Sequence, residues 1–589
     1  MPKMEWDSVD SAGIYVDPEE PERKASPVGQ EKQEIQKEPE KEPVKEEPKA
    51  KTVVPDILLL PKMKEEPKEE PVVLEDEKTV LSKFKDLLKP EDMVFVEVES
   101  KASGVSVETI LAQRRLVPEN VLLERLSKFF HVPLAKDIVP SLTDIKNNTA
   151  FFVTHNILPC ENNVFVIDSP RDQIKIEKLL FSNGYEKPKL RLSSEKHIKN
   201  ALRSALLTTR DTASVLYEKT RALVDQGLYA KCLDLFLRYA FQVNASDIHF
   251  ELSKTRGVVR MRVNGVLEYV TALSVQTYER IIIALYQRLG TPQPSSRESG
   301  DGAFVVEGLP LQIRTSLYPS LFSSHHAVLR LLYTNSAILS GQELGYEDDI
   351  WNRLVQTAKM TTSGIILYVG PTGSGKNASL LSLVSELDTV SKKLIEVADP
   401  IEYQHMLGIQ AQLTETDKND WTYAEALRAS LRHDPDIILI AEIRDTDSAK
   451  IALDAARTGH TILSTVHAES VFEAFDRLQD LGCNMSYLLS TVKAVVSQRL
   501  LRKACQKCHG AGCSHCFNGY TGRYAVPELL VLNEKFRTTC NGSLPNTKDA
   551  REALGKELCE GYVPLLEKAK ADAKEGKTTM EEVARVLGE

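Results

Sequence analysis

Residues 364–380, GIILYVGPTGSGKNASL, join an apolar run to a glycine-rich turn, and this stretch decides the fold. The run GIILYV is typical of a buried strand. The turn matches the phosphate-binding pattern G-x-x-x-x-G-K-[S/T] at Gly370, Gly375 and Lys376, but Asn377 stands where serine or threonine is usual. The preceding strand and the lysine in register favour a phosphate-binding loop over a plain glycine-rich turn. We therefore predict nucleotide binding.

The residue types of this loop suit a nucleoside triphosphate. Backbone N–H groups and the positive end of the following helix surround the phosphates, and Lys376 reaches the β- and γ-phosphates. In the phosphate-binding pattern, the serine or threonine hydroxyl after the lysine normally binds Mg²⁺. Asn377, at this place, offers a carbonyl oxygen on a longer side chain. Metal-assisted hydrolysis is thus left open. The predicted nucleotide-binding residues are Gly370, Pro371, Thr372, Gly373, Ser374, Gly375, Lys376, Asn377 and Ala378.

Length and composition limit the classes of protein to which this chain can belong. A chain of 589 residues predicts three or four domains. It has no run of eighteen apolar residues and no signal pattern at its N-terminus, so we expect a soluble, cytoplasmic protein. A net charge of −10 argues against broad electrostatic capture of nucleic acid.

The chain divides by composition and periodicity. The first 78 residues are rich in Glu, Lys and Pro and are predicted to be disordered; their apolar islands at 53–61 and 71–76 are either docking segments or patches without function. Apolar strands after the glycine-rich loop alternate with helices, which predicts an open α/β sheet. The expected parts are a disordered tail (1–78), a helical and mixed domain (79–190), an α+β domain (196–340), an α/β nucleotide-binding domain (341–504), a tetracysteine module (505–524) and a C-terminal helical region (525–589).

Polar residues at the strand ends are candidates for the chemistry. Glu442 ends the apolar run IILI and suits Mg²⁺ or its waters. In ADPIEYQH, either Asp399 or Glu402 suits the orientation or deprotonation of a water molecule. His460 and His467 bracket one strand, and His467 is as readily a structural residue as a phosphate sensor.

The sequence CQKCHGAGCSHC places Cys505, Cys508, Cys513 and Cys516 in two close pairs. Four thiolates at this spacing predict a closed, tetrahedral Zn²⁺ site that stabilises a local fold, although His509 and His515 compete as ligands. With nine cysteines in 589 residues, a metal site in a reducing compartment is favoured over a disulfide framework.

Residues from about 80 to 589 resemble the assembly ATPases of type IV pili and type II secretion, within the secretion ATPase superfamily. The motifs are GPTGSGK, ADPIEYQH, ALRASLRHDPDIILIAEIRD, TGHTILSTVHAES, QRLLRKACQKC, GYTGRYAVPELL and GKTTMEEV. The resemblance implies a RecA-like P-loop domain in a hexameric motor. It also implies a cytoplasmic ATPase, peripheral at the inner face of the cell membrane, that moves an inner-membrane platform protein.

The resemblance also implies roles for single residues. Lys376 corresponds to the phosphate-binding lysine, Glu402 to the general base, Glu442 to the residue that organises Mg²⁺ and water, and His467 to the γ-phosphate sensor. Arginines on strands of the preceding domain match arginines of the family. In the family some of these close onto the nucleotide as arginine fingers, and we assign this role to Arg314 and Arg330. The corresponding strand arginines are Arg260, Arg262, Arg314 and Arg330.

Several positions depart from the family pattern. Asn377 replaces the metal hydroxyl, Ala398 replaces an acid, Asn264 replaces an Asp, Ala303 replaces an arginine, and Glu469 interrupts the histidine motif.

In the N-terminal domain, Ser106 and Glu108 replace the arginine and glycine of the segment that binds cyclic di-GMP in some relatives, so this ligand is not expected. An active motor is favoured over a weakly hydrolytic scaffold of the same apparatus and over a nucleic-acid motor. Against the last of these, the sequence shows no basic stripe, and nucleic acid is not an expected partner.

Overall fold

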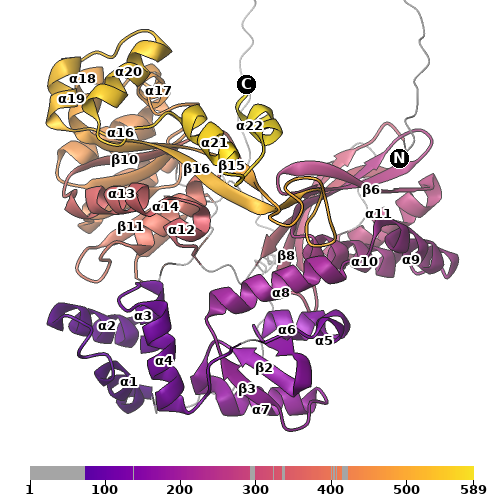
Figure 1. The fold of residues 1–589 in the computed structure, drawn as a ribbon. Coiled ribbons are helices and arrows are strands. Elements are labelled where there is room, and N and C mark those ends of the chain that lie inside the picture. Colours follow the sequence, from indigo (N-terminus) through magenta and orange to yellow (C-terminus); the bar gives the residue numbers. More distant parts are fainter. Residues whose placement is uncertain are drawn as a thin grey trace, which may run out of the picture. The chain divides into compact units, whose positions relative to one another are not determined.

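The computed structural model describes residues 73–136, 138–291, 299–322, 324–333, 338–399, 401, 403, 405, 407–413 and 422–588. These residues contain three β-sheets, each covered by helices (Figure 1). Within the described part of the chain, every helix is too short or too polar to cross a membrane. The apolar island at 53–61 lies outside the described residues.

The first sheet has the strand order β1-β2-β3 and lies among the N-terminal helices. Its elements are α1 (Val73–Ser82), α2 (Pro90–Ser103), α3 (Val107–Gln113), α4 (Glu119–Phe130), α5 (Leu142–Asn147), α6 (Thr149–Thr154), β1 (Leu158–Cys160), η1 (Glu161–Asn163), β2 (Val164–Ile167), η2 (Pro170–Asp172), α7 (Gln173–Ser182) and β3 (Lys189–Leu192).

Helix α1 begins at Val73, before the predicted onset of order near Thr79. The reason is a buried ionic cluster around Glu77, whose carboxylate accepts hydrogen bonds from the Val107 amide at 2.9 Å and from Arg171 Nη1 at 2.7 Å. Arg171 also donates to both oxygens of Glu108, each at 2.9 Å. Glu108 is therefore a structural partner of Arg171 in this fold.

The second sheet is antiparallel, with the order β6-β5-β4-β9-β8-β7. Its strands alternate buried and exposed side chains, as expected when helices cover one face. The elements are α8 (Glu195–Thr209), α9 (Ala213–Asp225), α10 (Tyr229–Gln242), β4 (Ala245–Leu252), β5 (Gly257–Val263), β6 (Val266–Leu273), α11 (Val275–Leu289), β7 (Gly300–Val305), β8 (Leu311–Pro319) and β9 (His325–Tyr333).

The third sheet has the order β12-β11-β13-β14-β10-β15-β16 and is parallel except for the β15–β16 pair. Its elements are α12 (Gly341–Leu344), α13 (Asp348–Met360), β10 (Gly364–Val369), α14 (Lys376–Ser385), β11 (Leu394–Ala398), β12 (Ile409–Gln412), α15 (Tyr423–Ser430), η3 (Leu431–His433), β13 (Ile437–Ile440), α16 (Thr446–Arg457), β14 (Thr461–Val466), α17 (Glu473–Asp480), α18 (Met485–Thr491), β15 (Val492–Ala504), β16 (Tyr520–Val531), α19 (Glu534–Cys540), α20 (Lys548–Leu558), α21 (Leu565–Lys574) and α22 (Met580–Leu587).

Strand β10 lies in the middle of this sheet and is buried along its whole length. Ile365, Leu367 and Val369 belong to one apolar cluster, whereas Ile366 and Tyr368 belong to another on the opposite face. Apolar residues on both faces are what a parallel sheet covered by helices requires. The strand predicted at GIILYV is confirmed.

Strands β15 and β16 extend beyond the rest of the sheet as a two-stranded ribbon (Figure 1). The β10–β15 ladder ends at Val369 opposite Ser497, whereas the β15–β16 ladder continues to Ala504 opposite Tyr520. The prediction that the C-terminal region is helical from residue 525 is therefore wrong over its first residues. Residues 525–531 form the last part of β16, the antiparallel partner of β15, and the next helix begins at Glu534.

A buried carboxylate attaches the last helix to this ribbon. Glu582 in α22 accepts hydrogen bonds from the Arg502 backbone amide at 3.0 Å, from Arg502 Nε at 2.7 Å and from Arg585 Nε at 2.7 Å. Burial opposes ionisation, but the hydrogen bonds from the two arginines hold the pKa of Glu582 below its ordinary value.

We expect Glu582→Ala to weaken the attachment of α22 by about 3 kcal/mol, because it leaves Arg502 without its buried partner. Hydrogen-exchange protection of the α22 amides measures this loss. Since the pKa of Glu582 is lowered in the folded chain, its contribution is present above the ordinary carboxylate pKa and is lost as pH falls through the folded value. Glu582→Gln is the matched control and should remove this pH dependence. Unchanged protection in Glu582→Ala would contradict the role.

Candidate functional site

The loop between β10 and α14 is closely packed at its first glycine. Gly370 has a φ of +148°, and a Cβ added there would lie 2.6 Å from Ser374 Oγ and 2.7 Å from the Gln498 carbonyl oxygen. A side chain at this position would fill the space in which the loop turns. Helix α14 begins directly after Gly375, so its unpaired N-terminal amide groups lie at the loop. This cradle fits a phosphate group.

Lys376 is buried in this loop, and its Nζ donates to the carbonyl oxygens of Gly370 at 2.6 Å and Pro371 at 3.1 Å. Burial lowers the pKa of Lys376, and the negative charge of Glu442 opposes that shift. The next residue, Asn377, is exposed in the first turn of α14. The side chain at position 377 is therefore accessible to solvent at the N-terminal end of this helix.

Glu442 and His467 come together at the carboxyl edge of the third sheet. Strands β13 and β14 are parallel neighbours, with Ile440 opposite Ser464, so the residues that follow them meet. Glu442 Oε1 lies 3.0 Å from His467 Nε2, and Glu442 Oε2 accepts a hydrogen bond from Arg444 Nε at 2.9 Å. The hydrogen bond to Glu442 raises the pKa of Arg444.

Sequence reasoning missed Arg444, although its position two residues after Glu442 was an available signal. Asp399 lies exposed at the end of β11, whereas the predicted general base, Glu402, lies outside the described residues. His460 precedes β14, and its Nδ1 lies 2.9 Å from the Ala455 carbonyl oxygen, which is a structural contact.

Arginines form a row across neighbouring strands of the second sheet. Arg314 in β8 is opposite Arg330 in β9, Arg330 is opposite Asp247 in β4, and Asp247 is opposite Arg262 in β5. Asp247 accepts a hydrogen bond from Arg330 Nε at 3.1 Å, and its other oxygen lies 3.7 Å from Arg262 Nε. Among the described residues, Arg314 has no carboxylate partner. The row therefore carries a net positive charge, with Asp247 between Arg262 and Arg330.

The cysteines that end the ribbon are arranged as a metal site. The Sγ atoms of Cys505, Cys508, Cys513 and Cys516 all lie within 4.8 Å of one another. The Cys505–Cys513 and Cys508–Cys516 Sγ distances are 3.8 Å and 3.6 Å. Thiolates about 2.3 Å from a tetrahedral zinc are about 3.8 Å apart, so these residues fit the ion. His509 and His515 are not needed to complete four ligands.

Backbone amides support the thiolates. The amides of Gly512 and Cys513 donate to the Sγ atoms of Cys508 and Cys516, both at 3.2 Å. Although burial opposes it, hydrogen bonds from the amides of Lys507 and Cys508 lower the pKa of Cys505 to about 7. A thiolate is the ligand form of cysteine, so the lowered pKa favours metal binding by Cys505, whereas burial raises the pKa of Cys516 to about 12.

We expect the purified chain to contain about one Zn²⁺ per molecule, because four thiolates complete a tetrahedral site. Elemental analysis of protein prepared under reducing conditions measures this content. Cys505→Ser should lose the ion and the exchange protection of residues 505–519, while Cys232→Ser, which alters a buried cysteine elsewhere, should keep both. A zinc-free native protein would rule out the site.

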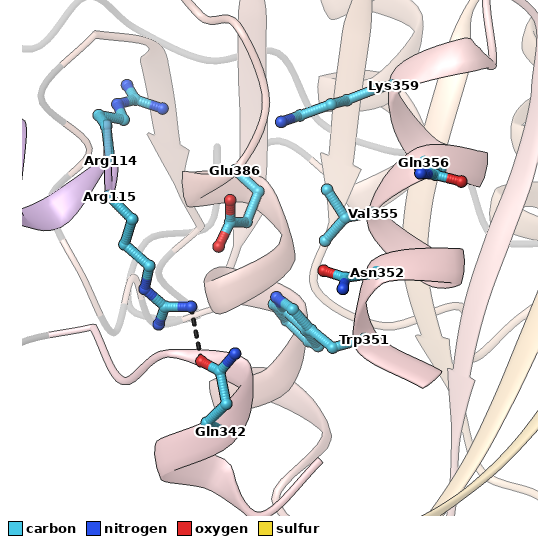
Figure 2. Close-up of a pocket in the computed structure, with 9 residues that line it drawn as sticks. All are labelled: Arg114, Arg115, Gln342, Trp351, Asn352, Val355, Gln356, Lys359 and Glu386. Atoms are coloured by element: carbon cyan, nitrogen blue, oxygen red, sulfur yellow. Dashed lines mark hydrogen bonds between the residues drawn. The ribbon is translucent and has the colours of Figure 1, made fainter. Parts of the chain in front are cut away.

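A separate cavity of about 460 Å³ lies among α12, α13 and the residues after α3 (Figure 2). Arg115 Nη1 donates to Gln342 Oε1 at 2.7 Å at its edge. Its lining carries both signs of charge and includes none of the predicted site residues: it consists of Arg114, Arg115, Gln342, Trp351, Asn352, Val355, Gln356, Lys359 and Glu386. We assign it no role.

A glycine-rich loop after the central strand, with an acid and a histidine at the ends of neighbouring parallel strands, defines the class of P-loop nucleotide-binding proteins. Residues 222–585 match the family described as Type II/IV secretion system protein, and the chain belongs to this family.

Two relatives and one solved structure illustrate the similarity. Type II secretion system protein E of Dickeya dadantii (strain 3937) is 32% identical over 391 residues, covering 62% of this chain and 77% of that protein. Type IV pilus assembly ATPase PilB of Thermus thermophilus is 31% identical over 390 residues, covering 61% and 43%. The X-ray structure of the Legionella pneumophila ATPase DotB is 22% identical, with a TM-score of 0.47, and covers 60% of this chain and 94% of that chain.

Proposed function

We propose that the protein is a hexameric ATPase that powers type IV pilus assembly or type II secretion. The observation that carries this proposal is the carboxyl edge of the third sheet, where Lys376 sits in the phosphate loop and Glu442 is held by His467 and Arg444. Family membership and the two named relatives support the choice of apparatus. The motor is proposed to act at the inner face of the cell membrane on an inner-membrane platform protein.

Each residue has a distinct proposed task. Lys376 and the loop amides bind the phosphates of ATP. Glu442 orients the attacking water, while His467, within hydrogen-bond distance of that carboxylate, reports the state of the γ-phosphate. Glu402 is the proposed base that takes the water's proton. Mg²⁺, when bound, neutralises charge on the phosphate oxygens, and Asn377 and Glu442 are the residues suited to hold it or its waters.

The second candidate is a nucleotide-binding scaffold that hydrolyses ATP weakly. Asn377 is the observation that favours it, because its exposed amide replaces the hydroxyl that usually ligates the metal. The two candidates differ in steady-state hydrolysis at saturating Mg²⁺, and the active motor is the one we propose.

Replacing Asn377 tests whether this residue governs the binding of Mg²⁺. Because the phosphates are held by the loop and by Lys376, Asn377→Thr should lower the Mg²⁺ concentration needed for half-maximal hydrolysis by about tenfold and leave ADP affinity without metal unchanged. Asn377→Ala should raise that concentration. Hydrolysis that appears only in Asn377→Thr would select the scaffold, and an unchanged metal dependence would show that this position does not govern the metal.

Replacing Arg314 tests whether the nucleotide site is shared between neighbouring subunits. An arginine without a carboxylate partner, on a domain separate from the phosphate loop, is suited to complete a nucleotide site contributed by a neighbouring subunit. Arg314→Ala should lower kcat by about 100-fold or more while ADP still binds. Arg221→Ala, on the exposed face of α9, is the matched control. Light scattering should show six subunits at saturating nucleotide, and a monomer with unaffected Arg314→Ala turnover would refute the arrangement.

A further inference from the structure

Gln498 in β15 is fully buried directly beside the phosphate loop. The β10–β15 ladder ends with Ser497 opposite Val369, so Gln498 follows where Gly370 opens the loop. A Cβ added at Gly370 would lie 2.7 Å from the Gln498 carbonyl oxygen, and one added at Gly375 would lie 2.9 Å from Gln498 Nε2. Both glycines of the phosphate-binding pattern therefore pack against this one residue.

The side-chain amide of Gln498 joins three segments. Its Nε2 donates to the Ser374 carbonyl oxygen at 2.8 Å, inside the loop. Its Oε1 accepts from Ser379 Oγ at 2.8 Å, in the helix that follows the loop, and from the hydroxyl of Tyr346. Burial raises the pKa of Tyr346, so this hydroxyl keeps its proton and remains a donor. Because a carbonyl cannot donate, the contact with Ser374 fixes which end of the amide faces the loop.

Tyr346 belongs to the connecting segment, residues 338–346, which leads from the second sheet into the third. Ser382 in α14 donates to the Leu339 carbonyl oxygen of this segment. The Tyr346 ring packs edge-on against Trp351, with ring centroids 5.1 Å apart. The connecting segment is thus attached to the helix of the phosphate loop and, through Gln498, to the loop itself.

We propose that Gln498 is a positioning residue that sets nucleotide affinity and couples the connecting segment to the phosphate loop through Tyr346. By holding the Ser374 carbonyl, it fixes the turn that directs the loop amides at a phosphate. Hydrogen bonds among buried side chains restrict their motion, and a loop held in this way loses less freedom when a nucleoside diphosphate binds. This inference rests on the proposed nucleotide binding and adds the residues that tune it.

The test measures the Kd of a fluorescent ADP analogue for the full chain in the absence of Mg²⁺. Gln498→Met keeps the size of the side chain and removes its hydrogen bonds, and it should raise the Kd about tenfold or more. Tyr346→Phe removes one donor and should raise the Kd by about two- to fivefold.

Combining the two variants distinguishes a specific role of the Tyr346–Gln498 hydrogen bond from a general loss of stability. If Tyr346 acts through Gln498, adding Tyr346→Phe to Gln498→Met should change the Kd no further. Tyr278→Phe is the matched control, since it removes a buried hydroxyl that donates to the His325 carbonyl oxygen at 2.8 Å in the second sheet, and its Kd should equal the native value.

Each outcome decides the inference. A native Kd in both Gln498→Met and Tyr346→Phe, or additive effects in the double variant, overturns the inference while the proposed function stands. A native chain that binds no ADP overturns both. Should Gln498→Met fail to fold, Tyr346→Phe and Ser379→Ala carry the test, because each removes one donor to Gln498 Oε1; unchanged Kd values in both overturn the inference.

Discussion

The pairing of β15 with two different partners is the constraint on which the nucleotide-binding part of the chain depends. On one side it forms a parallel ladder with β10, whose end becomes the phosphate loop, and on the other an antiparallel ladder with β16. Since both faces of the sheet are buried, a shift of β15 by one residue would turn Gln498 away from the loop and a core side chain toward it. The same register decides where the ribbon leaves the sheet, and so where the cysteine module begins.

Much of this sheet could be predicted because its signals are local. The runs GIILYV, IILI and TILSTV are continuous and apolar, as strands buried on both faces must be, and they form β10, β13 and β14. The positions of Glu442 and His467 could also be predicted, because each residue follows closely after one of these apolar runs. The cysteine spacing was equally informative, since two close pairs on short loops bring four sulfur atoms within reach of one ion. The chemical roles of these residues remain proposals.

The features that sequence reasoning missed depend on partners far along the chain. The first residues of helix α1, 73–78, were assigned to a disordered tail rich in Glu, Lys and Pro, yet Glu77 is buried and bonded to Arg171. The last residues of β16, 525–531, were assigned to a helical region because the partner strand of β16 lies before the cysteines. The hydrogen bonds of Gln498 reach back to Tyr346 and Ser379, and no pattern around residue 498 indicates them. A buried amide in an apolar strand is visible in the sequence, but its partners are set by the tertiary fold.

Asn377 and the residues that support the loop lie on different faces of α14, and we infer from this that the two can act separately. The face of α14 toward the sheet carries Ser379 and Ser382, which bond to Gln498 and to the connecting segment, whereas Asn377 is exposed. Under the proposed roles, a change at position 377 should alter ligation of Mg²⁺ and leave the turn of the phosphate loop in place. Loss of the Gln498 amide removes the hydrogen bond to the Ser374 carbonyl oxygen and leaves residue 377 unchanged. The two proposals together predict that metal dependence and nucleotide affinity respond to separate substitutions.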